Sequence, residues 1–186
     1  MLSFHLFRIP TNNDPFNAVH INWYFAYGSN MNPERMRARG LAFAEAESGH
    51  LHRFGLYFNK RASGKDGVGY ANIGHCGNAR VEGVLYQLVD PREISIMDGF
   101  EGCPVRYSRE VMRIHRPRFE DEVDAWVYVA NPAFIESSLL PERRYLNHLM
   151  AGARWHSEAY QVTLRQQSCI EQMSADKGAG GLAYND

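Results

Sequence analysis

Residues 23–33 read Trp-Tyr-Phe-Ala-Tyr-Gly-Ser-Asn-Met-Asn-Pro. The apolar and aromatic run that opens this segment predicts a buried strand, and the Gly-Ser-Asn that follows predicts a tight turn. Pro33 is typical of the first position of a helix. A strand that ends in such a turn leaves backbone N–H groups without partners in the sheet, and these groups can hold an anionic oxygen or a developing oxyanion. We therefore expect a binding site where this strand ends.

The remainder of the chain predicts an α+β fold. Segments rich in β-branched and aromatic residues predict strands at residues 23–27, 50–59, 68–73, 81–88, 107–115 and 123–129. Helices are predicted at residues 33–39, 91–97, 141–153 and 157–166, and the first three begin at a proline. Asp90 and Glu93 have the spacing of a capping box. Strands dominate the first two thirds of the chain, so we expect a small mixed β-barrel or curled sheet with a few flanking helices.

The length of 186 residues suits one domain with two loose ends. Residues 1–20 carry a cluster of loop-forming residues between Pro10 and Pro15 and predict an irregular leader. Residues 173–186 are rich in glycine and predict a flexible tail. The segment between them, residues 21–172, is expected to form the domain.

Composition narrows the classes of partner. A net charge of -1 gives no reason to expect nucleic acid. The sequence contains no run of about 18 apolar residues that could cross a membrane and no continuous apolar stretch of the signal-peptide kind at its start. Three scattered cysteines, Cys76, Cys103 and Cys169, fit free thiols in a reducing compartment. We expect a cytoplasmic protein; its oligomeric state is not indicated by the sequence.

Glu101 is the acidic residue with the most unusual surroundings. It lies in Asp98-Gly99-Phe100-Glu101-Gly102, among largely apolar neighbours. The two glycines allow backbone conformations that direct a side chain inward. A carboxylate buried there would have a raised pKa and could carry protons near neutral pH. The alternative is a surface glutamate in a turn, paired with Arg106 or Arg109.

Taken together, these segments closely resemble the γ-glutamylcyclotransferase family, with its AIG2-like fold. The resemblance rests on an ordered set of segments: residues 24–30, 69–73, 81–86, 98–102, Tyr107, 125–128, 141–145 and 152–153. It covers most of the predicted domain.

The resemblance implies a cofactor-independent cyclotransferase of the lyase or acyltransferase type, without a metal. Such an enzyme converts a small γ-glutamyl amino acid or amine to 5-oxoproline and releases the free amine. The family's binding turn falls on Tyr27, Gly28, Ser29 and Asn30, and its catalytic acid falls on Glu101. Its cavity tyrosine falls on Tyr145, which shares a helix face with Leu149 and could equally be a packing residue.

Two alternatives stay open. The chain could act on another γ-glutamyl compound such as glutathione, or it could be a non-catalytic module that binds a γ-glutamyl metabolite. Residues 62–66 and 116–121 match no family segment, so the leaving amine is not indicated. Ser29 lacks the surroundings of a serine nucleophile and is interpreted as a turn hydroxyl.

Other polar residues are interpreted as ordinary surface groups. His50 and His52 share one face of a strand, which is more typical of a solvated face than of a metal site. Glu82 lies in a predicted strand and could be a second acid, but the simpler expectation is that it points outward. Arg35, Arg37 and Arg39 are expected on a solvated helix face, although they could attract an acidic substrate. His75, Cys76 and Cys103 lack the paired spacing of a zinc site.

Overall fold

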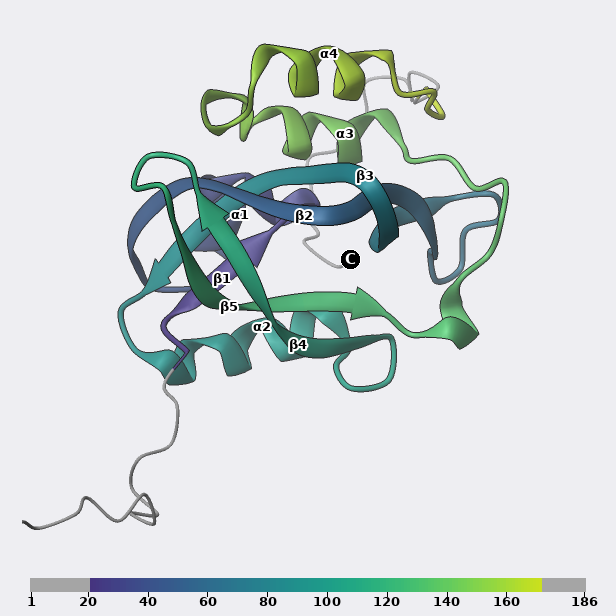
Figure 1. Cartoon of the computed structure of the whole chain (residues 1–186). Coiled ribbons are helices and arrows are strands. Elements are labelled where there is room, and N and C mark those ends of the chain that lie inside the picture. Colours follow the sequence, from purple (N-terminus) through teal and green to yellow (C-terminus); the bar gives the residue numbers. More distant parts are fainter. Residues whose placement is uncertain (1–20, 172–186) are drawn as a thin grey trace, which may run out of the picture.

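The computed structural model describes residues 21–171, and its centre is a closed five-stranded barrel with the strand order β1-β3-β2-β4-β5 (Figure 1). The strands are β1 (Trp23–Ala26), β2 (Phe43–Arg61), β3 (Gly69–Leu88), β4 (Tyr107–Arg116) and β5 (Asp121–Ala130). This architecture confirms the predicted α+β fold with a small barrel. The predicted leader (residues 1–20) and tail (residues 173–186) lie outside the described residues.

The long β2–β3 hairpin forms much of the barrel wall. Its two strands pair antiparallel from Phe43 opposite Leu88 to Arg61 opposite Gly69. Two separate strands were predicted within residues 68–88, and this prediction is wrong because β3 is continuous. Residues 74–80 contain glycine and asparagine, which disfavour a strand. The backbone stays extended through them, although the β2–β3 ladder shifts register there, from His75 opposite Phe54 to Arg80 opposite His52.

The barrel closes through β1, which pairs antiparallel with β3 and parallel with β5. The side chains of β1 alternate between two buried clusters. Tyr24 and Ala26 pack in a cluster that reaches the helices, whereas Phe25 packs with Leu85 in the other cluster. A strand buried on both faces has a continuous apolar sequence rather than an alternating one, which explains the run at residues 23–27.

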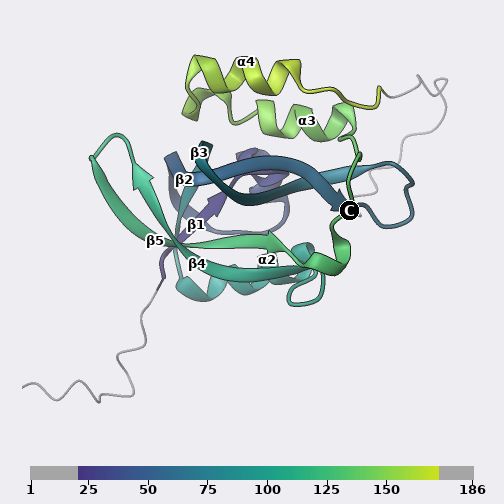
Figure 2. The ribbon, with the colours of Figure 1, turned by 45° about the vertical axis from the view of Figure 1, so that its right-hand side comes forward.

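The helices cover two sides of the barrel. In two views, α3 (Arg143–Met150) and α4 (Glu158–Gln166) stack over β2 and β3, and α2 (Ile94–Glu101) lies on the opposite side beneath β4 and β5 (Figures 1 and 2). The remaining helical segments are short: α1 (Pro33–Ala38), η1 (Ser29–Met31), η2 (Pro91–Glu93), η3 (Pro132–Phe134) and η4 (Ala153–Trp155). Within residues 21–171, no helix has the length and apolar character needed to cross a membrane.

Two details of the helix predictions are wrong. Pro141 does not begin a helix, because α3 starts at Arg143 and the Pro141 carbonyl accepts a hydrogen bond from Ile170 N at 2.9 Å. The Asp90 carboxylate caps Arg92 N at 2.9 Å, while Glu93 Oε2 accepts from Ala42 N at 3.3 Å. Glu93 therefore binds the start of β2 in place of completing a capping box.

Candidate active site

The glycine turn forms as predicted and passes directly into η1. Met31 N donates to Gly28 O at 2.9 Å, which closes the first turn of the 3-10 helix. A Cβ atom on Gly28 would lie 2.9 Å from Tyr145 Oη and 3.1 Å from Ala71 Cβ. Gly28 is therefore needed for close approach, because its missing side chain leaves room for the Tyr145 hydroxyl beside the turn.

Asn30 is buried, and its amide group connects the turn to the candidate acid. Its Nδ2 donates to Tyr24 Oη at 2.7 Å and to Glu101 Oε1 at 2.9 Å. Its Oδ1 accepts from Arg39 Nη1 at 2.9 Å, and its carbonyl accepts from the Tyr86 hydroxyl at 2.8 Å. Both amide hydrogens are used, so the Asn30 side chain has one orientation and presents a donor to Glu101.

Glu101 is the last residue of α2, and Gly102 follows it in the left-handed conformation with φ 64°. Glycine adopts this conformation without strain and ends the helix there. The Glu101 side chain is 18% exposed and lies 3.6 Å from Arg39 Nη1. Arg109 instead pairs with Asp98 at 2.7 Å. The structure thus places Glu101 against the turn and beside Arg39, so the alternative of a surface glutamate paired with Arg106 or Arg109 is wrong.

The surroundings of Glu101 act on its pKa in opposite directions. Burial raises the pKa, whereas the charge of Arg39 and the hydrogen bond from Asn30 lower it; the net direction is upward. A carboxylate with a raised pKa holds a proton more readily than an exposed glutamate and is better matched to proton transfer near neutral pH.

Tyr145 lies on α3 with its hydroxyl at the turn. The hydroxyl accepts from Ala71 N at 3.0 Å, and the ring centroid lies 5.0 Å from that of Tyr70. Burial raises the pKa of Tyr145 to about 12, so the phenol keeps its proton at neutral pH. Leu149, on the same helix face, is fully buried. The face that packs α3 onto the barrel therefore also delivers a hydroxyl to the turn.

Tyr27 differs from the other turn residues because its side chain binds β5. Its side chain is buried, and its hydroxyl donates to the Tyr128 carbonyl. The side chain of Tyr27 thus ties β1 to β5, and its backbone is the part that belongs to the turn. The structure brings Gly28, Ser29, Asn30, Glu101 and Tyr145 together: the Tyr145 hydroxyl lies beside Gly28 and Ser29, and Asn30 binds Glu101.

Three cations lie near the acid. Two of them, Arg35 and Arg39, were considered as groups that could attract an acidic substrate, and Lys60 was missed. The charges of Arg39, Arg35 and Lys60 all lower the pKa of Glu101. The Arg39 side chain is only 9% exposed, and its guanidinium stacks 4.5 Å from the Phe100 ring centroid. The solvated helix face predicted for these arginines is wrong for Arg39. Only Arg37 is exposed among them, and its guanidinium lies over Phe43.

A sequence signal for the arginines was available, but none for the lysine. Arg35 and Arg39 are four residues apart and so share a helix face, the face that meets η1. Lys60 is buried in β2, and its ammonium lies 5.2 Å from the Tyr70 ring centroid and 5.5 Å from that of Tyr107. Nothing in the sequence around Lys60 distinguishes it from an edge lysine. Together the three cations make the surroundings of Glu101 suitable for a ligand that carries a carboxylate.

Glu82 is a structural acid rather than a catalytic one. It is 1% exposed, so the predicted outward position is wrong. Its carboxylate accepts from Ser157 N at 2.6 Å, from Ser157 Oγ at 2.8 Å and from Arg80 Nη2 at 2.7 Å. Ser157 is the N-cap of α4. Glu82 therefore joins β3 to the start of the last helix.

The loop at residues 62–66 lines a hollow with Phe134 and Glu136. Neither Glu101 nor Tyr145 belongs to its lining. The hollow is thus a separate feature from the cluster around the glycine turn, and nothing in its lining identifies a leaving amine.

A closed barrel with a carboxylate held against a Tyr-Gly-Ser-Asn turn defines a class of protein. The sequence model described as gamma-glutamyl cyclotransferase, AIG2-like, matches residues 24–157. The chain belongs to this family, which confirms the resemblance found in the sequence. No curated protein sequence matches this chain.

Solved structures share the fold. An uncharacterized human protein, loc79017, is 24% identical, with 82% of this chain and 91% of that chain covered and a TM-score of 0.71. A protein named gamma-glutamyl cyclotransferase is 21% identical, with coverage of 85% and 92% and a TM-score of 0.67. A yeast gamma-glutamyl cyclotransferase specific to glutathione is 12% identical, with coverage of 76% and 93% and a TM-score of 0.57. At these identities the likeness is one of fold.

Proposed function

We propose that this protein is a γ-glutamyl cyclotransferase that converts a γ-glutamyl amino acid or amine to 5-oxoproline and releases the free amine. One observation carries the proposal: the Glu101 carboxylate lies against the glycine turn and receives a hydrogen bond from Asn30 at 2.9 Å. The family match supports the same general function.

The substrate brings its own nucleophile, and the protein supplies position and proton transfer. The α-amine attacks the γ-carbonyl carbon, a C–N bond forms, and a five-membered ring closes. Holding the γ-glutamyl group in a folded, near-attack geometry removes much of the entropic barrier to this step. The charges of Arg39, Arg35 and Lys60 suit the α-carboxylate, which fixes the end of the substrate that carries the amine.

Glu101 performs both proton transfers. The ammonium form of the α-amine cannot attack, so the ionised carboxylate first removes a proton. The scissile C–N bond then breaks as Glu101 returns that proton to the leaving nitrogen. The new ring nitrogen loses one further proton, which departs with the released amine as its ammonium ion. The negative charge that develops on the carbonyl oxygen between these steps is stabilised by fixed donors, for which the backbone N–H groups of Gly28–Asn30 are proposed. The neutral Tyr145 phenol offers a further donor beside the turn.

The test is 5-oxoproline release from γ-glutamyl amino acids, γ-glutamylamines and glutathione, with the intact protein, Glu101→Gln and Glu110→Gln. Glu110 is exposed on β4 and serves as the matched control. We expect release by the intact protein and the control, and a loss of about 10²–10⁴-fold in Glu101→Gln. Far-UV circular dichroism checks that each variant is folded.

The panel also separates the two alternatives. Release from glutathione alone would assign the chain to the glutathione-specific relatives. No release from any member, combined with saturable binding of a γ-glutamyl ligand, would contradict the enzymatic proposal and identify a binding module.

A further inference from the structure

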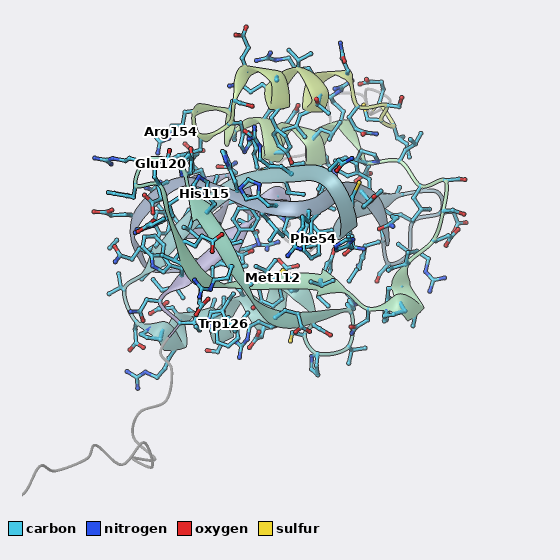
Figure 3. All side chains as sticks on the ribbon, in the orientation of Figure 1. Phe54, Met112, His115, Glu120, Trp126 and Arg154 are labelled. Carbon is cyan, nitrogen blue, oxygen red and sulfur yellow. The ribbon has the colours of Figure 1, made fainter. Side chains whose placement is uncertain are left out.

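Three histidines converge on the outer face of the barrel. His50 and His52 are two residues apart on β2, and His115 on β4 is the partner of His50 in the antiparallel pair. Figure 3 labels His115 near the end of β4 that enters the β4–β5 hairpin. Leu51, between His50 and His52, and Ile114, next to His115, are buried in the hydrophobic cluster that also contains Phe25 and Leu85. Because side chains alternate along a strand, the three imidazoles lie on the opposite face, away from that cluster.

The imidazoles are close enough to share one ion. The ring centroids lie 6.3 Å apart for His50 and His52, 6.0 Å for His50 and His115, and 5.5 Å for His52 and His115. One nitrogen from each ring lies within 4.8 Å of the other two. Tetrahedral zinc, with Zn–N bonds of about 2.0–2.1 Å, needs nitrogens about 3.3 Å apart. Small rotations of the three side chains about their χ angles can supply this contraction, since His52 is exposed and the other two are half-buried.

The charges around the cluster allow a cation. Glu82 is the partner of His50, and Arg80 is the partner of His52, in the β2–β3 pair. Arg80 binds the Glu82 carboxylate at 2.7 Å, which offsets its positive charge. The β2–β3 pairs fix the backbones of His50 and His52 just before the register shift that follows His52. The single His50–His115 pair places the third donor beside them on β4, so the three donor positions are set before an ion binds.

We propose that His50, His52 and His115 form a binding site for a divalent transition-metal ion, with zinc as the best match. Three neutral imidazoles provide the donor set that zinc and its neighbours in the first transition series prefer. A site with three protein ligands keeps one coordination position open, so the bound ion would carry a water or an exogenous ligand there. This interpretation replaces that of a solvated face for His50 and His52. It is independent of Glu101, because none of the three histidines contributes to the cluster at the glycine turn.

The experiment uses the full chain without an affinity tag. Zinc binding is measured by isothermal titration calorimetry and by competition with a chromogenic chelator, and cobalt(II) is added separately to record the visible spectrum of the site. We expect one tight equivalent per chain, a tetrahedral cobalt spectrum and a rise in thermal unfolding temperature with zinc. A His52→Gln or His115→Gln variant loses a direct ligand, so its affinity is expected to fall by more than the roughly 10–100-fold that loss of an outer partner produces.

His75→Gln is the matched control, because His75 is an exposed strand histidine outside the cluster. Circular dichroism without metal checks folding, and exposed His52 gives a variant whose fold does not depend on the removed ring. Unchanged zinc affinity in His52→Gln and His115→Gln would overturn the proposal. Equal loss in His75→Gln, or absence of any tight equivalent in the intact protein, would also overturn it.

Discussion

Asn30 is the residue at which the glycine turn meets the acid of α2. Its amide donates to both Tyr24 and Glu101, and its carbonyl oxygens accept from Arg39 and Tyr86. A side chain with every polar atom engaged has no freedom to rotate. Asn30 therefore acts as a positioning residue for Glu101, and its amide helps to keep that carboxylate ionised against the effect of burial.

The Asn30→Asp variant tests this role through the pH profile. Glu101 must be ionised to accept the first proton, so kcat/KM of the intact protein is expected to fall as pH drops through the raised pKa of Glu101. An aspartate in place of the amide removes a donor and adds a like charge, and both changes raise that pKa further. We expect the acidic limb of the kcat/KM profile to move to higher pH. Asn78→Asp, at an exposed position of β3, should leave the limb in place; an unmoved limb in Asn30→Asp would contradict the assignment.

The fit of Gly28 against Tyr145 is tested with a double-mutant cycle. Gly28→Ala places a methyl group 2.9 Å from Tyr145 Oη, and overpacking of this kind lowers the free energy of unfolding by about 1–3 kcal/mol. Tyr145→Phe removes the oxygen and should restore part of that loss in the double variant. Chemical denaturation of the four proteins measures the coupling. Strictly additive effects would show that the methyl group and the hydroxyl do not meet.

At the scale of helices and strands, short-range sequence patterns predicted well where the elements lie in the chain, but predicted poorly which of their side chains face inward. The strand–turn–helix at residues 23–38 formed as predicted because apolar runs, a Gly-Ser-Asn turn and a proline act within a few residues. The continuity of β3 was missed because its glycines and asparagine indicate a break; the β2–β3 ladder does shift register there, but the strand does not end. The inward face of α1 was missed because Arg39 is held by Asn30 and Phe100, the latter far away in the chain.

The connection between β3 and α4 gives a prediction about stability and pH. Burial alone would raise the pKa of Glu82, but the hydrogen bonds from Ser157 and Arg80 outweigh it and lower the pKa. Because its pKa is lower in the folded state, the ionised Glu82 carboxylate stabilises the protein at pH values above the unfolded-state pKa of about 4.3. This contribution to the free energy of unfolding is lost as pH falls through the folded-state pKa. We expect Glu82→Gln to lower the free energy of unfolding by about 2–3 kcal/mol at neutral pH.

In acid the difference in free energy of unfolding between the intact protein and Glu82→Gln should shrink, because protonation of Glu82 removes the negative charge that the substitution also removes. Urea denaturation at several pH values measures it, with Glu122→Gln at an exposed position of β5 as the control. A difference that stays constant from neutral to acidic pH would contradict the role of the ionised carboxylate.

At the scale of the whole molecule, closure of the barrel assembles the cluster around Glu101. The turn follows β1, the acid ends α2, Lys60 belongs to β2 and the tyrosine comes from α3. These groups meet because β1 is inserted between β3 and β5 and because α3 packs against η1. The integrity of the cluster therefore depends on the barrel core.

The core gives the last prediction. Leu85 on β3 is fully buried beside Phe25, so Leu85→Ala is expected to lower the free energy of unfolding by about 2–5 kcal/mol. Val111→Ala, at a position of β4 that is 47% exposed, should change it by about 0.5 kcal/mol or less. Urea unfolding followed by tryptophan fluorescence and by circular dichroism measures both. Similar effects of the two variants would contradict a closed, close-packed barrel.

The sequence by itself determined the β1 turn, most strand positions, the α+β class and the family, because these depend on residues close together in the chain or on motifs in a given order. Only the tertiary structure decided that Glu101 faces Asn30, that Arg39 and Lys60 surround that acid, that Glu82 holds α4 and that His115 joins His50 and His52. Each of these contacts joins residues from different elements. Their geometry follows from strand register and barrel closure, which no local pattern encodes.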